Sequence, residues 1–359
     1  MKDMQHQYAL LSKDNLDGFI SRLSGIKKVM APFSKGHNNY SFEEARSGEG
    51  IALNYIPTIL PPKKFFMPQY ETLFSYKVGK TINVETVVDY EEMVLFGVHT
   101  CDLAGIQCLN MVFSERPKDY NYLTRKPNIF VIGLECNNYC DEHASCHLVN
   151  ASLPSGGYDL FFTDLGDYFM VHVNTQEGEE MVEATKSFEP AGKDQLHELA
   201  DLREQKRKIF KNEVTISPRH LPELFEGAFE SKVWNELGER CLACGNCTNV
   251  CPTCYCFDIR EDVSLDRKSG SRYRMWYSCQ VEPFAKVAGG INFRGERSAR
   301  QRHRYYRKFK YPVLKFSRFF CTGCGRCSRT CMAGIHLKET LNALVKEKQS
   351  KLWRDWGIK

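Results

Sequence analysis

The most constraining feature of this 359-residue chain is a pair of cysteine runs in its C-terminal third. Both runs have the spacing C-x2-C-x2-C-x3-C: the first is Cys241, Cys244, Cys247 and Cys251, and the second is Cys321, Cys324, Cys327 and Cys331. This spacing is that of two-cluster ferredoxins, in which each run holds a [4Fe–4S] cluster and the fourth cysteine ligates the other cluster. The two runs therefore predict a protein that transfers electrons.

Zinc is the main alternative, because soft thiolate ligands bind both iron–sulfur clusters and zinc. Structural zinc sites usually use two separated C-x2-C pairs or mixtures of Cys and His, which two undivided quartets fit poorly. Gly245, Gly323 and Gly325 lie inside the runs, where they let the backbone turn sharply and bring amide N–H groups toward the sulfurs. The runs favour clusters, and a non-redox zinc or nucleic-acid-binding module is the competing hypothesis.

The composition is that of an ordinary globular protein, with 42% hydrophobic and 26% charged residues. The net charge of +5 is mild and indicates no particular partner. The polar first residues lack the apolar core of a signal peptide, and no apolar run is long enough to cross a bilayer. Clustered cysteines in such a chain favour metal binding over disulfides. We therefore expect a cytoplasmic protein without a membrane span, in an anaerobic setting that spares oxygen-sensitive clusters.

Residues 1–235 predict an α/β domain. The apolar stretches 93–98 and 128–134 predict buried strands, and the residues between them have a helical period, which indicates a βαβ unit with a parallel sheet. Residues 159–174 predict two strands that form a hairpin, with its turn at Gly166 and Asp167.

Three helices are expected around this sheet and after it. Ser12 is a candidate N-cap of a helix whose apolar residues recur at helical spacing. The charged stretch 193–211 predicts a solvated helix, and 221–241 predicts one amphipathic helix that leads into the first cysteine run. Residues 236–359 then predict an α-helical two-cluster ferredoxin-like domain.

The two runs are separated by a basic insertion, residues 252–320, which is longer than a minimal two-cluster ferredoxin needs. Within it, residues 294–310 carry eight Lys or Arg and one Glu. Three interpretations compete: a solvated helix face, a docking surface for an acidic partner, and a nucleic-acid-binding segment. Because no nucleic-acid-binding fold signature is present, we expect no nucleic-acid partner. Basic groups beside an anionic cluster would also favour its reduced state.

The remaining cysteines are less constrained by their spacing. Cys254, Cys256 and Cys279 are either buried small hydrophobic residues or ligands. Cys108 falls inside the predicted helix of the βαβ unit, where we expect it in the core.

Four cysteines of the N-terminal region could hold a third cluster. Cys101 and Cys136 follow the two predicted parallel strands, whose carboxyl ends meet at the edge where α/β folds bind ligands. Cys140 and Cys146 come from the loop after Cys136. The alternative is that all four are ordinary reduced cysteines. The chain has no G-x-G-x-x-G or P-loop sequence and no readable catalytic constellation. We therefore predict no catalytic residue, and the sequence leaves a flavin site without such a motif as an open alternative.

Several longer segments resemble the iron–sulfur protein family shared by anaerobic sulfite reductases and cytosolic sulfhydrogenases, in which it forms the beta subunit of the sulfhydrogenase. They are CLACGNCTNVCPTCYCFD, WYSC, AGGINFR and CTGCGRCSRTC, with GVHTCDLAGIQCL and VIGLECNNYC upstream, and together they span roughly residues 90–335. Tyr277 and Met332 depart from the family's usual residues. The resemblance implies a subunit that relays electrons between a flavoprotein subunit using NAD(P)H and a catalytic subunit of the hydrogenase or sulfite/sulfur reductase type.

The resemblance also implies the cluster ligands. One cluster would take Cys241, Cys244, Cys247 and Cys331, and the other would take Cys321, Cys324, Cys327 and Cys251.

Overall fold

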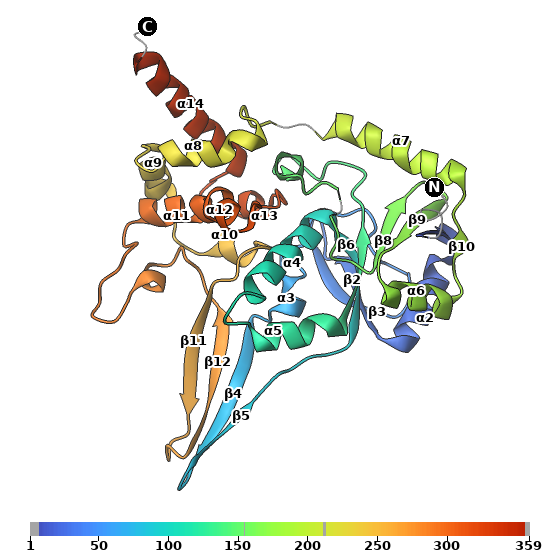
Figure 1. Ribbon diagram of the computed structural model, residues 1–359, viewed down its shortest axis with the longest axis horizontal. Helices are drawn as coiled ribbons and strands as arrows, with labels where there is room; N and C mark the ends of the chain where they lie inside the picture. The colour runs from blue at the N-terminus through green and yellow to red at the C-terminus, as the bar shows by residue number, and fades with distance from the viewer. Residues whose placement is uncertain (1–6, 154, 211–212, 356–359) are drawn as a thin grey trace. The chain divides into compact units, whose positions relative to one another are not determined.

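The computed structural model describes residues 7–153, 155–210 and 213–355 (Figure 1). The chain forms two compact units, each assembled from separate segments. The first comprises Met1–Phe66, Asp89–Asp141 and Ala151–Lys211, and the second comprises Met67–Val88, Glu142–Asn150 and Asn212–Lys359. The boundary expected at residue 235 falls inside the second unit, because Leu221 and Phe225 belong to the same hydrophobic cluster as Phe309.

The first unit is built on an eight-stranded sheet with the order β10-β1-β9-β8-β7-β6-β2-β3. The four strands β2, β6, β7 and β8 run parallel, and antiparallel strands extend the sheet on either side. In chain order the strands are β1 (Tyr8–Ser12), β2 (Lys28–Ser34), β3 (Tyr40–Ala45), β6 (Met93–His99), β7 (Ile129–Leu134), β8 (Leu160–Asp164), β9 (Tyr168–Val173) and β10 (Glu189–Pro190).

The predicted βαβ unit is confirmed. Strands β6 and β7 pair in parallel, with Val94 opposite Phe130, and α4 (Thr100–Phe113) connects them. Every residue of both strands is buried, as expected for parallel strands that are covered on both faces. The predicted hairpin is also confirmed, because β8 and β9 pair antiparallel around Gly166.

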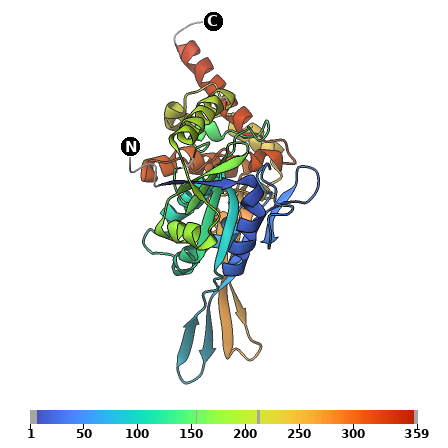
Figure 2. The same ribbon diagram turned by 90° about the vertical axis from the view of Figure 1, so that its right-hand side faces the viewer.

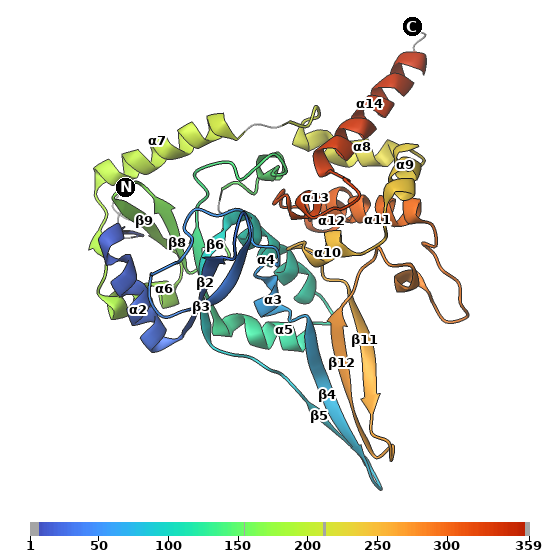
Figure 3. The same cartoon turned by 180° about the vertical axis from the view of Figure 1, so that it is seen from behind.

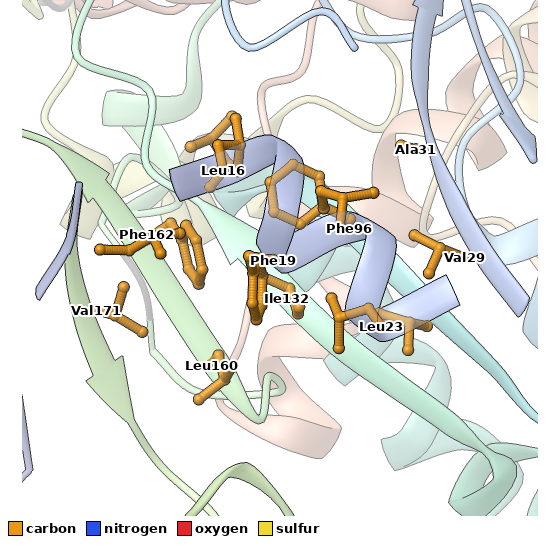
Figure 4. Packing of buried hydrophobic residues seen from close by; sticks show 14 of the residues in the cluster. Leu16, Phe19, Leu23, Val29, Ala31, Phe96, Ile132, Leu160, Phe162 and Val171 are labelled. Carbon is orange, nitrogen blue, oxygen red and sulfur yellow. The ribbon is translucent and has the colours of Figure 1, made fainter. Parts of the chain in front are cut away.

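Helices cover both faces of this sheet. On one face, α2 (Leu16–Ile26) packs Phe19 and Leu23 against sheet residues such as Phe162, as Figure 4 shows. On the other face, Leu103 of α4 lies close to Gly133 of β7. The unit also contains α3 (Lys63–Phe66), α5 (Tyr120–Arg125), α6 (Gln176–Thr185) and α7 (Lys193–Ile209).

Two expectations for these helices were wrong. Ser12 does not cap α2: it ends β1, where it pairs with Tyr168, and a short 3-10 turn separates it from the helix. Helix α7 is not wholly solvated, because Leu199 and Lys206 on one side of it are buried. The last residue of that predicted helix, position 211, lies outside the described residues.

The second unit contains a four-stranded antiparallel sheet with the order β11-β12-β4-β5. One hairpin is β4 (Tyr70–Val78) with β5 (Ile82–Thr86), and the other is β11 (Phe257–Val263) with β12 (Ser269–Trp276). The pairing of β4 with β12 joins the two hairpins into one sheet, which is visible in Figure 2. The expectation of an α-helical domain therefore holds for only part of this unit.

The helices of the second unit surround the two cysteine runs (Figure 3). They are α8 (Leu221–Gly227), α9 (Val233–Arg240), α10 (Asn246–Asn249), α11 (Arg297–Phe309), α12 (Tyr311–Phe316), α13 (Arg326–Arg329) and α14 (Leu337–Asp355). The single helix expected over 221–241 is two helices, because the chain turns at Ala228, whose carbonyl accepts a hydrogen bond from the Trp234 indole at 2.5 Å. No helix in the described ranges is long and apolar enough to cross a membrane.

Candidate iron–sulfur centres

The two cysteine runs have the same local fold. In each run a glycine with positive φ, Gly245 at +80° or Gly325 at +76°, precedes a one-turn helix that carries the third cysteine. The two short helices lie together, and the side chain of Asn246 on α10 donates a hydrogen bond to the carbonyl of Thr330 after α13 at 2.9 Å. This arrangement places the two runs beside each other within one unit.

Each run encloses a cavity that the fourth cysteine of the other run completes. One cavity is lined by Cys241, Cys244, Cys247 and Cys331. The other is lined by Cys321, Cys324, Cys327 and Cys251, with Cys247 also at its wall. The structure thus brings together both sets of four cysteines that were expected to ligate clusters.

The surroundings of the sulfurs fit iron–sulfur ligation. Backbone N–H groups of Ala243 and Gly323 approach the Sγ atoms of the cysteines two residues before them, at 3.3 and 3.4 Å. Such N–H contacts to sulfur are among the features that set cluster potentials. Burial raises the pKa of Cys247 to about 12, so a thiolate there needs positive charge in the cavity, which the iron of a cluster supplies.

Helix α11 contains most of the basic run and lies against both cavities. Gln301 donates a hydrogen bond from Nε2 to Cys241 Sγ at 2.9 Å. Lys308 donates from Nζ to Cys251 Sγ and to Cys254 Sγ, each at 3.2 Å. The side chain of Arg304 is buried and lines both cavities. Of the three interpretations of the basic run, the solvated helix face therefore does not describe this side of α11.

Three further cysteines, Cys254, Cys256 and Cys279, lie between the two runs in the sequence. Cys254 contacts Lys308 as described. Cys279 is buried, and a hydrogen bond from Cys256 lowers the pKa of Cys279 to about 6. Among the described residues that line the two cavities, Cys254, Cys256 and Cys279 do not occur.

The loop of the second run leaves no room for a side chain at Gly323. Its φ is +62°, and its carbonyl accepts a hydrogen bond from the Ser145 amide at 2.7 Å. A Cβ atom added at Gly323 would lie 2.2 Å from the carbonyl carbon of Ser145. The segment Glu142–Asn150 thus packs directly on a loop that lines a cavity.

We expect Gly323→Ala to destabilise the second unit by about 2–5 kcal/mol. The positive φ accounts for about 1–2 kcal/mol of this loss, and the forced backbone contact accounts for about 1–3 kcal/mol. Gly289 is the matched control, because its φ is +90° but nothing lies within 4 Å of an added Cβ. Urea unfolding of the two variants measures the difference, and equal losses in both would contradict the close approach.

Two of the four N-terminal cysteines share a third cavity. Cys136 and Cys140 line a cavity of about 360 Å³ in the first unit, beyond the carboxyl ends of β6 and β7. A hydrogen bond from Cys140 lowers the pKa of Cys136, and attraction to His99 acts in the same direction although burial opposes it. His99 lines the same cavity, is buried, and stacks on Tyr55 with ring centroids 3.8 Å apart.

The other two cysteines of that set are not among the residues that line this cavity. Cys101 is buried in the first turn of α4 and is not among the residues that line the cavity. Cys146 belongs to the second unit, where it begins a 3-10 turn and its amide lies beside Gly323. Cys108 is buried in α4, as expected.

The sequence interpretation did not identify Gln301, Arg304 and Lys308 as residues of the cluster sites. Their spacing of three and four residues places them on one face of a helix, which was the available signal. His99 stands at the end of a buried strand, directly before Thr100 and Cys101. Ligands of α/β folds bind beyond the carboxyl ends of parallel strands, so this position was also a signal for a site residue. Within the described ranges, no three His, Cys, Asp or Glu side chains converge on the position of one metal ion.

Comparison with known proteins agrees with this geometry. Residues 240–335 match the family model described as a 4Fe-4S dicluster domain. The chain is 37% identical over 336 residues to the sulfhydrogenase 2 subunit beta of Pyrococcus furiosus, which covers 92% of this chain and 97% of that protein. No solved structure matches the chain. The dicluster match supports two [4Fe–4S] clusters in place of the zinc alternative. The chain therefore belongs to the sulfhydrogenase beta-subunit family, as the resemblance of its motifs predicted.

Proposed function

We propose that this iron–sulfur electron-transfer subunit relays electrons between a flavoprotein subunit that uses NAD(P)H and a catalytic subunit of the hydrogenase or sulfite/sulfur reductase type. The observation that carries the proposal is the exchange of fourth cysteines between the two cavities, because it sets two cluster sites side by side. Cys247 lies at the wall of both cavities. Membership of the sulfhydrogenase beta-subunit family supports a place in a multi-subunit oxidoreductase.

The eight cysteines of the two runs are the proposed ligands. The first cluster is assigned to Cys241, Cys244, Cys247 and Cys331, and the second is assigned to Cys321, Cys324, Cys327 and Cys251. Each cluster, when bound, accepts and releases single electrons. The chain's own part is to hold the ligands in place, to exclude water and to supply hydrogen bonds and charge around the sulfurs. No side chain of this subunit is assigned a bond-making step.

A third cluster in the first unit is a further part of the proposal. Cys136 and Cys140 are its proposed ligands, since both line the cavity beyond β6 and β7. This site would extend the path of electrons through the subunit. Cys101 and Cys146, the other two cysteines expected for it, are tested one at a time in the experiment below.

Iron and acid-labile sulfide, measured in anaerobically purified protein, test these assignments. Two clusters give about eight irons and three give about twelve per chain, with equal amounts of sulfide. Cys136→Ala, Cys140→Ala, Cys101→Ala and Cys146→Ala should lower twelve to eight only where the residue is a ligand. Cys108→Ala is the control, because Cys108 is buried in the core of the first unit. Zinc without sulfide would contradict the proposed function.

The partner subunits are tested separately. Mass spectrometry of proteins that copurify with the tagged chain should identify a flavoprotein and a catalytic oxidoreductase subunit. Reduction of the clusters by NADH or NADPH should then require the flavoprotein, and the absorbance of the clusters reports it. Direct reduction of the isolated subunit by NAD(P)H would contradict the assignment of the nucleotide site to a partner.

A further inference from the structure

We propose that one face of α11, formed by Gln301, Arg304 and Lys308, sets the reduction potentials of both clusters. In this assignment Arg304 raises the potentials of both clusters, Gln301 raises only the first, and Lys308 raises only the second. The inference rests on the proposed function, since it takes the eight cysteines of the runs as the cluster ligands.

The placement of the three side chains separates their effects. They are three and seven residues apart along α11, so the helix presents them on one face. Gln301 lines only the cavity of the first cluster, where it donates to Cys241 Sγ. Lys308 lines only the cavity of the second cluster, where it donates to Cys251 Sγ. Arg304 lies between them on the helix and lines both cavities.

Arg304 is a buried cation whose counter-charge comes from the cysteines. Only 6% of the residue is exposed, and among the described residues no Asp or Glu forms an ion pair with it. Its Nη1 lies 3.4 Å from Gln301 Oε1, and its guanidinium lies 5.0 Å from the centre of the Tyr305 ring.

A buried charge without a partner is strongly unfavourable, so this arginine needs negative charge nearby. Arg304 lines the cavities together with Cys247 and Cys327, whose thiolates supply negative charge beside it once the clusters are bound. Those two cysteines belong to different runs, which makes Arg304 a shared counter-charge.

The direction of the effect follows from charge. A reduced cluster carries one more negative charge than an oxidised cluster, so a fixed cation stabilises the reduced form more and raises the potential. The low dielectric of a buried site strengthens this interaction. Hydrogen bonds to ligand sulfurs act in the same direction, because they also stabilise the more negative state. Loss of any of the three groups should therefore make the affected potential more negative.

Three substitutions and an EPR-monitored redox titration of the isolated subunit test this pattern. Arg304→Met should lower both midpoint potentials, each by at least a tenfold change in the equilibrium constant for reduction, which is 59 mV for one electron. Gln301→Leu should lower only the midpoint of the first cluster, and Lys308→Met only that of the second. The same substitutions in a Cys324→Ala or Cys244→Ala background, each of which keeps only one of these two clusters, assign each midpoint.

Arg302→Gln is the control on the same helix. The Arg302 guanidinium lies 3.8 Å from the centre of the Phe229 ring and donates to the Phe229 carbonyl, and it lines neither cavity among the described residues. Both midpoints should be unchanged in this variant. If Arg304→Met has its full iron content and both midpoints stay within a twofold change in the equilibrium constant, the inference is overturned and the proposed function stands. Absence of iron from the unmodified protein would instead overturn the proposed function.

If the Arg304→Met variant does not assemble its clusters, two further variants test the inference. Arg304→Lys keeps the charge and Arg304→Gln removes it, so the lysine variant should keep both midpoints near those of the unmodified protein and the glutamine variant should lower both. Equal midpoints in the two variants would show that shape rather than charge matters at this position, and would overturn the inference.

Discussion

Replacing Cys251 and Cys324 together by alanine should remove about four irons per chain, whereas replacing Cys244 and Cys251 together should remove about eight. Cys251 lines the cavity of the run that contains Cys324, so the first pair removes two ligands of one cluster. Cys244 lines the other cavity, so the second pair removes one ligand from each cluster. Iron and sulfide analysis of anaerobically purified variants measures both outcomes.

The reverse result would refute the exchange of fourth cysteines. If each run instead held its own cluster with its own four cysteines, the Cys244 and Cys251 pair would lose only about four irons and the Cys251 and Cys324 pair would lose about eight. Circular dichroism should accompany the analysis, so that loss of iron is not confused with loss of the fold. The Cys108→Ala variant again serves as the control for a buried cysteine outside the runs.

Replacing Glu135 by glutamine should destabilise the first unit by about 3–5 kcal/mol, because it leaves two cations without their buried partner. The Glu135 side chain is fully buried and accepts from Arg203 and from Lys206, both at 3.0 Å. The hydroxyl of Thr163 donates to the same carboxylate at 2.9 Å. Glu204 pairs with Arg207 at 3.0 Å on the exposed side of α7, so Glu204→Gln is the matched control, with an expected change of about 0–1 kcal/mol.

The stabilisation by Glu135 should depend on pH. Burial alone would raise the pKa of Glu135, but attraction to Lys206 and Arg203 outweighs burial and lowers the pKa below its ordinary value. A carboxyl group whose pKa is lower in the folded state stabilises the fold above its unfolded pKa of about 4.3, and this stabilisation is lost as the pH falls through the folded value. The stability difference between the unmodified protein and Glu135→Gln, measured by urea unfolding, should therefore narrow below about pH 4.3. A difference that stays constant there would contradict an ionised Glu135.

The parallel strands of the first unit could be predicted from local sequence patterns. The stretches that became β6 and β7 are almost wholly apolar, and a parallel sheet covered on both faces favours such runs. The spacing of the two cysteine runs likewise indicated two clusters and the exchange of fourth cysteines between them.

Pairings between distant segments could not be predicted in the same way. The sheet of the second unit joins β4 to β12, which lie almost two hundred residues apart, and no local pattern specifies such a pairing. The environment of the basic residues in 294–310 could not be predicted from local sequence either. A basic run is interpreted as solvated unless the position of its counter-charge is known. Here Lys308 contacts Cys251 Sγ, and Arg304 lines both cavities of the cysteine runs. The ion pair of Glu135 with Lys206 could not be inferred from the sequence either, because 71 residues separate them.

The shared use of the fourth cysteines also bears on how the protein is made. A ribosome synthesises Cys241, Cys244 and Cys247 first, but the cavity that they line is completed by Cys331, which is ninety residues further along the chain. The nascent polypeptide therefore lacks a complete set of thiolates for either site until the second cysteine run has been synthesised. The cell's assembly machinery can accordingly complete neither cluster before the second run has left the ribosome.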